Sequence, residues 1–173
     1  MHYGNIKNCD IANGEGVRVS LFVSGCRNHC PGCFQPETWD FNYGQEFTKD
    51  TADKIIAMLN EPYIDGLTIL GGEPFEPENQ EVIHDFLACV KVYAIGKTVW
   101  MYTGYALDKD LMPSGSKYTQ YTDDILSMID VLVDGRFEID KKNISLRFRG
   151  SENQRILDVR KSLAKKSPVI YMY

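Results

Sequence analysis

Short apolar runs alternate with helical patterns along this chain, and the alternation restricts its fold more than any other feature. Four runs rich in β-branched and aromatic residues predict buried strands, at 17–23, 67–70, 98–102 and 131–133. Between these runs, apolar residues at helical spacing predict helices, two of them capped by Thr48 and Thr122 and one following the stripe from Val82 to Tyr93. Strands separated by helices build a mainly parallel sheet, so the predicted fold class is α/β.

Two further elements are predicted towards the C-terminus. The alternating run 144–148 predicts a fifth strand, and a basic helix is predicted over roughly 153–166. In a parallel sheet, ligands bind beyond the carboxyl ends of the strands. Four unusual sequences follow the four predicted strands, namely Cys26–Cys33, Gly71–Pro74, Thr103–Gly104 and Asp134–Gly135. We therefore expect these sequences to meet at one rim of the sheet.

Composition and charge disfavour a membrane-spanning, a secreted or a nucleic-acid-binding protein. With 173 residues, 43% hydrophobic and 25% charged, the chain suits a single domain spanning 1–173. It has no apolar run of about 20 residues and no secretory signal, so a cytoplasmic location without a membrane partner is expected. Residues 136–173 hold 10 Lys and Arg against 4 Asp and Glu. This basic segment is either a partner-docking surface or a solvated helix, and nothing else indicates nucleic-acid binding.

Three of the five cysteines, Cys26, Cys30 and Cys33, lie within eight residues. An odd count in a reducing compartment disfavours disulfides. Thiolates are the soft ligands of iron–sulfur clusters, and three thiolates on a four-iron cubane leave one iron open. The competing interpretation is a zinc site completed by His29 or a distant cysteine, although zinc loops usually come as two C-x2-C pairs. Cys89 lies beside an apolar stripe and is expected in or near the core.

The C-x3-C-x2-C loop resembles the cluster-binding motif of the radical S-adenosylmethionine superfamily. The whole chain is similar to one branch of it, the activating enzymes of anaerobic (class III) ribonucleoside-triphosphate reductase. The stretches that carry the resemblance are 10–18, 21–26, 30–34, 38–39, 71–74, 100–105, 131–137 and 149–155. The cysteine loop identifies only the superfamily, whereas the stretch Arg149–Arg155 and the short chain point to the reductase-activating branch.

The resemblance implies a partial, open (β/α) barrel and particular roles for the residues at its rim. Cys26, Cys30 and Cys33 would hold a [4Fe-4S] cluster. Residues 32–34, which are Gly32, Cys33 and Phe34, would pass close to the nucleoside of S-adenosyl-L-methionine. The turn 71–73, which is Gly71, Gly72 and Glu73, would meet the amino group of its methionine.

Two positions at this rim have alternative roles. Many superfamily members carry an aromatic residue where this chain has Gly32, placed against the adenine. The adenine contact must then come from elsewhere, with Phe34 and Tyr102 as candidates. Thr103 is a candidate to hydrogen-bond the ribose or to position the partner, and the alternative is ordinary turn chemistry.

The implied activity is reductive cleavage of S-adenosyl-L-methionine to a 5′-deoxyadenosyl radical, which takes a hydrogen atom from a glycine of the reductase. The implied partners are the large subunit of the class III reductase and a one-electron donor such as flavodoxin or ferredoxin, and a homodimer is compatible with the sequence. Three alternatives stay open: an activase of another glycyl-radical enzyme such as pyruvate formate-lyase, a radical enzyme acting on a small molecule, and a zinc-stabilised binding module without catalysis.

Overall fold

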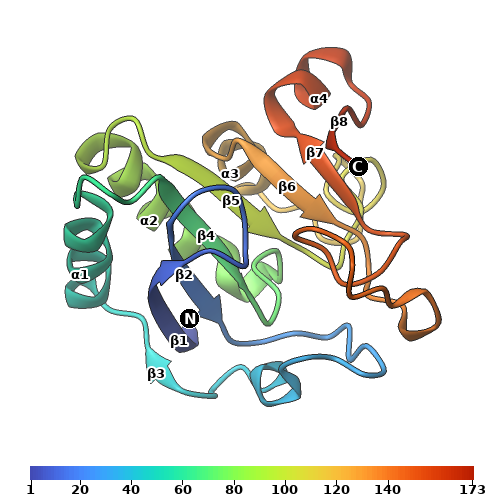
Figure 1. Cartoon of the computed structure of the whole chain (residues 1–173), viewed down its shortest axis with the longest axis horizontal. Helices are drawn as coiled ribbons and strands as arrows, with labels where there is room; N and C mark the ends of the chain where they lie inside the picture. The colour runs from blue at the N-terminus through green and yellow to red at the C-terminus, as the bar shows by residue number, and fades with distance from the viewer.

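The computed structural model describes residues 1–173, and its eight strands form one mixed sheet (Figure 1). The order across the sheet is β3-β1-β2-β4-β5-β6-β7-β8. The strands are β1 (His2–Asp10), β2 (Arg18–Val23), β3 (Gln45–Glu46), β4 (Gly66–Gly71), β5 (Thr98–Tyr102), β6 (Val131–Asp134), β7 (Arg155–Asp158) and β8 (Ile170–Met172). The helices are α1 (Lys49–Leu59), α2 (Pro77–Tyr93), α3 (Thr122–Met128) and α4 (Val159–Lys165), with 3-10 turns η1 (Pro36–Trp39) and η2 (Ile139–Lys141).

The centre of the sheet is parallel and its flanks are antiparallel. Strands β2, β4, β5 and β6 pair in parallel, and they include the four predicted runs. The pairs β1–β2, β1–β3, β6–β7 and β7–β8 are antiparallel. No α-helix lies between β1 and β2 or between β6 and β7, and antiparallel neighbours need no helical crossover. The predicted α/β class is thus confirmed, and a mainly parallel arrangement holds only for the middle of the sheet.

The two faces of the sheet differ in what covers them. On β5, Val99 and Met101 join the large core that α1, α2 and α3 complete, whereas Trp100 belongs to a smaller cluster on the opposite face. Helix α1 begins as predicted, because the Thr48 side chain accepts a hydrogen bond from the Thr51 backbone N–H. None of the helices combines the length and the apolar character needed to cross a membrane.

Of the two elements predicted near the C-terminus, the strand is wrong and the basic helix is confirmed only in its second half. Residues 144–148 alternate like a strand, yet they lie in a loop where Ile144 is 92% exposed and Phe148 has a φ of 56°. The predicted basic helix is restricted to α4, because Arg155–Asp158 pairs with β6 as a strand. The Asp158 side chain then caps α4 by accepting from the Lys161 N–H.

Three flanking strands carry no pattern that would predict them. β1 has mostly polar, half-buried or exposed residues, and β3 and β8 are only two and three residues long. A strand without a buried apolar face lacks the alternation that indicates a strand.

Cys89 is exposed, so the expectation that it lies in or near the core is wrong. It projects from the solvent side of α2 rather than from the buried stripe.

Candidate functional site

A cavity of about 500 Å³ opens at the carboxyl ends of the parallel strands. Its lining includes residues that follow all four of these strands: Cys26 after β2, Gly72 after β4, Thr103 after β5 and Gly135 after β6. Figure 1 shows the cysteine loop and the long loop after β6 at the end of the sheet towards which the parallel arrows point. The expected convergence of four sequence-distant segments on one rim is therefore confirmed.

The three clustered cysteines all line this cavity and all are free thiols. Cys26 and Cys30 are buried and Cys33 is half-buried, so the loop turns its sulfur atoms inwards. The backbone N–H of Cys33 donates to the carbonyl of Cys30 at 3.1 Å, and the N–H of Gln35 donates to Cys33 Sγ at 3.5 Å. Burial raises the pKa of the Cys26 thiol to about 11, and a bound iron ion would reverse this effect by favouring the thiolate.

The donor set fits an iron–sulfur cubane better than a single zinc ion. No group of three His, Cys, Asp or Glu side chains is arranged to hold one metal ion. A cubane takes each thiolate on a different iron atom, so its ligands need not converge on one point. His29, the candidate fourth zinc ligand, instead stacks on Trp39 with ring centroids 4.6 Å apart.

Two glycines at the end of β4, Gly71 and Gly72, allow close packing against the end of β2 and against the backbone of Gly25 and Thr38. Gly71 has a φ of 109°, and a β-carbon there would lie 2.7 Å from the carbonyl oxygen of Val23. A β-carbon at Gly72 would lie 2.8 Å from the carbonyl oxygens of Gly25 and Thr38. Real β-carbons do not approach backbone so closely, so larger residues would displace the end of β2 at position 71 and the backbone of Gly25 and Thr38 at position 72. These glycines accommodate the protein's own backbone, and their contact with a ligand stays a prediction.

Glu73 joins three of the converging segments. Its carboxylate is 1% exposed and accepts from Thr103 Oγ1 at 2.7 Å, from the N–H of Gly104 at 2.7 Å and from Asn28 Nδ2 at 3.2 Å. The N–H of Phe75 donates to it as well, at 3.0 Å. Burial raises the pKa of Glu73 to about 7, although these hydrogen bonds favour the charged form. Glu73 and Thr103 both line the cavity, and each is already hydrogen-bonded to the other.

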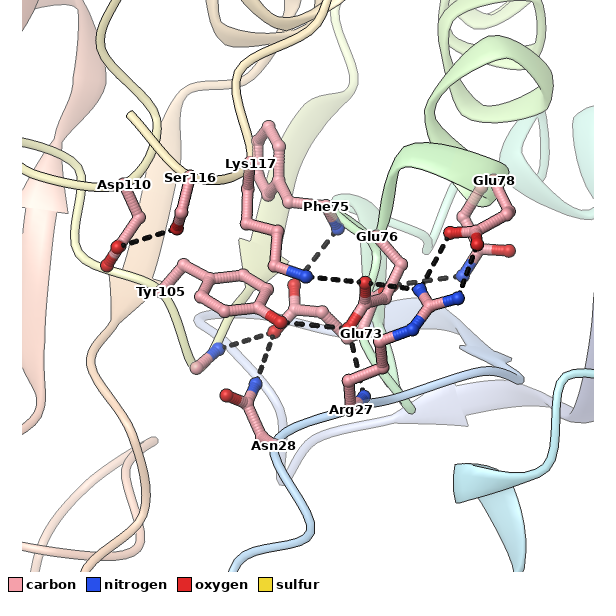
Figure 2. A network of polar contacts seen from close by, with 12 residues as sticks. Arg27, Asn28, Glu73, Phe75, Glu76, Glu78, Tyr105, Asp110, Ser116 and Lys117 are labelled. Atoms are coloured by element: carbon pink, nitrogen blue, oxygen red, sulfur yellow. Dashed lines mark hydrogen bonds and ion pairs between the residues drawn. The ribbon is translucent and has the colours of Figure 1, made fainter. Parts of the chain in front are cut away.

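A second buried carboxylate, Glu76, anchors the cysteine loop (Figure 2). Its side chain is 0% exposed and accepts from the backbone N–H and the Nη1 of Arg27, each at 2.9 Å. Tyr105 Oη and Lys117 Nζ complete its partners at 2.8 and 2.9 Å. Arg27 also pairs with Glu78, which lies in the first turn of α2. Sequence reasoning missed this network, because its members are scattered over about 90 positions with no motif spacing.

Gly32 and Phe34 both lie next to residues from the loop after β6. Phe34 lines the cavity, is 67% exposed and contacts Phe137, with ring centroids 5.3 Å apart. Gly32 does not line the cavity; it has a φ of 72°, and a β-carbon there would lie 2.7 Å from Ile139 Cδ1. The space beside Gly32 is therefore occupied by residues from the loop after β6.

We expect Gly32→Ala to destabilise the protein through both its backbone conformation and this contact. The left-handed conformation alone costs about 1–2 kcal/mol for a residue with a β-carbon. Gly96 is the matched control, because it has a similar φ of 82° and a β-carbon there would have no neighbour within 4 Å. Thermal unfolding is expected to show a larger loss for Gly32→Ala than for Gly96→Ala, and Ile139→Ala is expected to remove the difference. Equal losses in the two single variants would contradict the contact.

The segment 136–154, which we name the rim loop, borders the cavity next to the cysteine loop. Gln154 connects the two ends of this segment. Its Oε1 accepts from the N–H of Gly150 at 2.8 Å, and its Nε2 donates to the carbonyl of Gly135 at 3.0 Å. Asn153 Nδ2 donates to the carbonyl of Arg136 at 2.7 Å. The stretch Arg149–Arg155, notable in the sequence, thus holds the rim loop in place.

Asp134 is not available to a ligand in this arrangement. Its buried carboxylate accepts from Arg155 Nε at 2.8 Å and Nη2 at 2.6 Å, and from the N–H of Leu107 at 2.8 Å. Arg155 extends the pairing to Asp108. These contacts tie the start of β7 to the end of β6, next to the base of the rim loop.

Comparison with known proteins first gives the class. The model of a family described as a 4Fe-4S single cluster domain matches residues 12–157, so this is an iron–sulfur protein. The match covers the cysteine loop, the four parallel strands and the rim loop. It agrees with the thiol set and disfavours the zinc module.

Relatives then give the family. A protein of Salmonella typhimurium is 44% identical over 159 residues, covering 89% of this chain and 96% of that one. Proteins of Escherichia coli (strain K12) and Enterobacteria phage T4 are 42% and 38% identical over 89% and 90% of this chain, and over 96% and 93% of their own lengths. All three are named anaerobic ribonucleoside-triphosphate reductase-activating protein. This chain belongs to that family, which confirms the resemblance seen in its motifs.

Proposed function

We propose that this protein activates an anaerobic ribonucleoside-triphosphate reductase by generating a glycyl radical on it. The observation that carries the proposal is the placement of Cys26, Cys30 and Cys33 in one cavity with the turn 71–73. The named activity of the relatives supports the same target. The finer fold proposed with this function is the partial, open barrel of radical S-adenosylmethionine enzymes, formed as one domain over 1–173.

Within this proposal, each segment of the rim has its own task. Cys26, Cys30 and Cys33 would hold the [4Fe-4S] cluster, and the three thiols would leave one of its four irons to S-adenosyl-L-methionine. The chemistry supplied by the bound cluster is one-electron reduction of S-adenosyl-L-methionine, which breaks the S–C5′ bond. The turn 71–73 receives the methionine amino group at the end of β4. Cys33 and Phe34, which line the cavity, would lie along the nucleoside, with Phe34 offering an exposed ring, while Gly32 would hold the turn of the loop just before them.

The protein's own contribution is positioning rather than acid–base catalysis. Glu73 fixes Thr103, Gly104 and Asn28 around one wall of the cavity through its hydrogen bonds. Glu76 fixes the cysteine loop through Arg27. Since the abstracted hydrogen atom belongs to a glycine of another polypeptide, the cavity must admit a segment of that polypeptide. A small external protein, such as a flavodoxin or ferredoxin, supplies the electron.

The test is anaerobic incubation of the cluster-loaded protein with S-adenosyl-L-methionine, a reductant and each candidate partner. We expect the doublet EPR signal of a glycyl radical on the class III reductase and none on pyruvate formate-lyase. A signal only on pyruvate formate-lyase would assign the protein to the other glycyl-radical enzyme. Absence of 5′-deoxyadenosine despite a full cluster would reject the radical chemistry itself.

A further inference from the structure

The rim loop holds five basic residues against three acidic ones, Glu138, Asp140 and Glu152, and most of its cations are unpaired. Arg136, Lys142, Arg147 and Arg149 make no ion pair, and only Lys141 is neutralised, by Glu138. The chain as a whole has a net charge of −5, so this is not a general property of its surface. We propose that the rim loop is the docking surface for the reductase, and that it binds a carboxylate-rich surface flanking the reductase's glycine segment. This inference rests on the proposed function.

The position of these charges follows from the contacts of the rim loop. Arg136 donates from Nη2 to the carbonyl of Asn28 in the cysteine loop, and Lys142 Nζ lies 5.2 Å from the centre of the Phe34 ring. Arg149 lines the cavity itself, and its buried Nε has no hydrogen-bond partner. The cations therefore lie along the side of the opening that the rim loop forms, where a glycine segment must pass.

Apolar side chains are exposed among the cations. Ile144 is 92% exposed, Phe34 67% and Ile139 43%. Protein interfaces combine exposed apolar anchors with arginine, whereas a merely solvated basic surface has no need of them. The mixture favours a protein partner over a small anion.

The rim loop is held in one conformation before any partner arrives. The N–H of Asn143 donates to the carbonyl of Gly150 at 3.2 Å, and the N–H of Glu152 donates to the carbonyl of Lys141 at 3.0 Å. The Asn143 side chain also donates to Glu152 Oε1 at 3.0 Å. With the bracing by Gln154 and Asn153, these bonds reduce the conformational entropy that docking would otherwise cost.

The other basic residues near the C-terminus lie elsewhere. β7 runs antiparallel to β6, with Arg155 opposite Asp134 at the cavity end and Asp158 opposite Val131 at the far end. Helix α4 begins at that far end, and Figure 1 shows it well away from the rim loop. The docking segment expected from the sequence, 136–173, is thus divided, and only the rim loop borders the cavity.

A second copy of this chain is a less suitable occupant than the reductase. The acidic part of another copy would complement the charge, since residues 1–135 hold 9 Lys and Arg against 20 Asp and Glu. A copy seated on the rim loop would, however, cover the cavity opening. The proposed reaction requires that opening to admit the substrate glycine.

The test compares two double variants that change the same residue types. Ile144→Ser/Arg147→Glu alters two exposed side chains of the rim loop, neither of which lines the cavity. Ile95→Ser/Arg160→Glu makes the same changes at the far end of the sheet, where Ile95 is 83% exposed and Arg160 lies in the first turn of α4. Affinity for the intact reductase is measured for cluster-free and cluster-loaded protein at low and high salt, together with 5′-deoxyadenosine formation without the reductase.

We expect the rim variant to bind the reductase at least about tenfold more weakly and to form proportionally less glycyl radical at low reductase concentration. The affinity of the control variant for the reductase should stay within about twofold of the wild-type affinity. High salt should lower the affinity of the wild type more than that of the rim variant. Both variants should form 5′-deoxyadenosine normally, which separates docking from the chemistry. Equal affinities of the two variants would overturn the proposal, as would a rim variant that changes only self-association. A wild type that binds through the rim loop but forms no glycyl radical would reject the proposed function and leave the docking surface standing.

Discussion

Replacement of Cys26, Cys30 or Cys33 by serine is expected to reduce cluster content sharply and 5′-deoxyadenosine formation to background. Each of the three cysteines lines the same cavity, whereas His29, the histidine within the loop, does not line it and stacks on Trp39. A serine hydroxyl is a harder and much less acidic ligand than a thiol, so it holds the iron of such a cluster much more weakly. Iron and sulfide analysis of the anaerobically reconstituted variants gives the direct measurement.

Cys89→Ser and Cys9→Ser are the matched controls for this series. Both cysteines are free and exposed, and neither lines the cavity. They are expected to keep the full iron and sulfide content and normal 5′-deoxyadenosine formation. A Cys30→Ser variant that keeps a complete, active cluster would contradict the assignment, as would loss of the cluster in Cys89→Ser.

The second large effect is expected at Glu76, which does not itself line the cavity. Glu76→Ala removes the partner of Arg27, Lys117 and Tyr105 at once. Removing one member of a buried ion pair typically costs about 3–5 kcal/mol. Here we expect a loss at or below the lower end of that range, because Lys117 is only 16% exposed but Arg27 is 51% exposed and keeps Glu78 as a partner. Since Arg27 follows Cys26 directly, we also expect the cluster to be lost about 10- to 100-fold more readily. Chemical denaturation and the rate of cluster loss to a chelator measure the two effects.

Glu78→Ala is the control at the other end of the same arginine. The Glu78 side chain is 51% exposed, and a pair at that exposure contributes about 0–1 kcal/mol. Its removal should leave cluster retention close to that of the wild type. If Glu76→Ala and Glu78→Ala were equally mild, the buried network would not be the anchor of the cysteine loop.

The sequence predicted the parts of this protein that follow a local pattern. The four parallel strands were visible because their residues are buried on both faces, which gives continuous apolar runs. The cysteine loop and the turn 71–73 were visible because cluster ligands and close-packed glycines must stand at fixed spacing. Their meeting at one cavity followed from the rule that parallel strands end at the same edge.

The remaining parts depend on contacts between distant segments. Glu76 looks like an ordinary helix-start glutamate until Arg27 and Lys117 are brought to it by the fold. Run 144–148 has the alternation of a strand but finds no neighbouring strand to pair with, so it stays in the rim loop. Arg155–Asp158 lies in a basic stretch that favours a helix, and pairing with β6 overrides that preference.

The most direct test of the central claim is to follow the hydrogen atom itself. A class III reductase labelled with α-deuterated glycine is incubated anaerobically with the cluster-loaded protein, S-adenosyl-L-methionine and a reductant, and the 5′-deoxyadenosine is analysed by mass spectrometry. We predict that deuterium enters 5′-deoxyadenosine in step with growth of the glycyl radical signal. 5′-Deoxyadenosine that stays unlabelled while the glycyl radical forms would show that the hydrogen is not taken directly from the glycine, and would contradict the account.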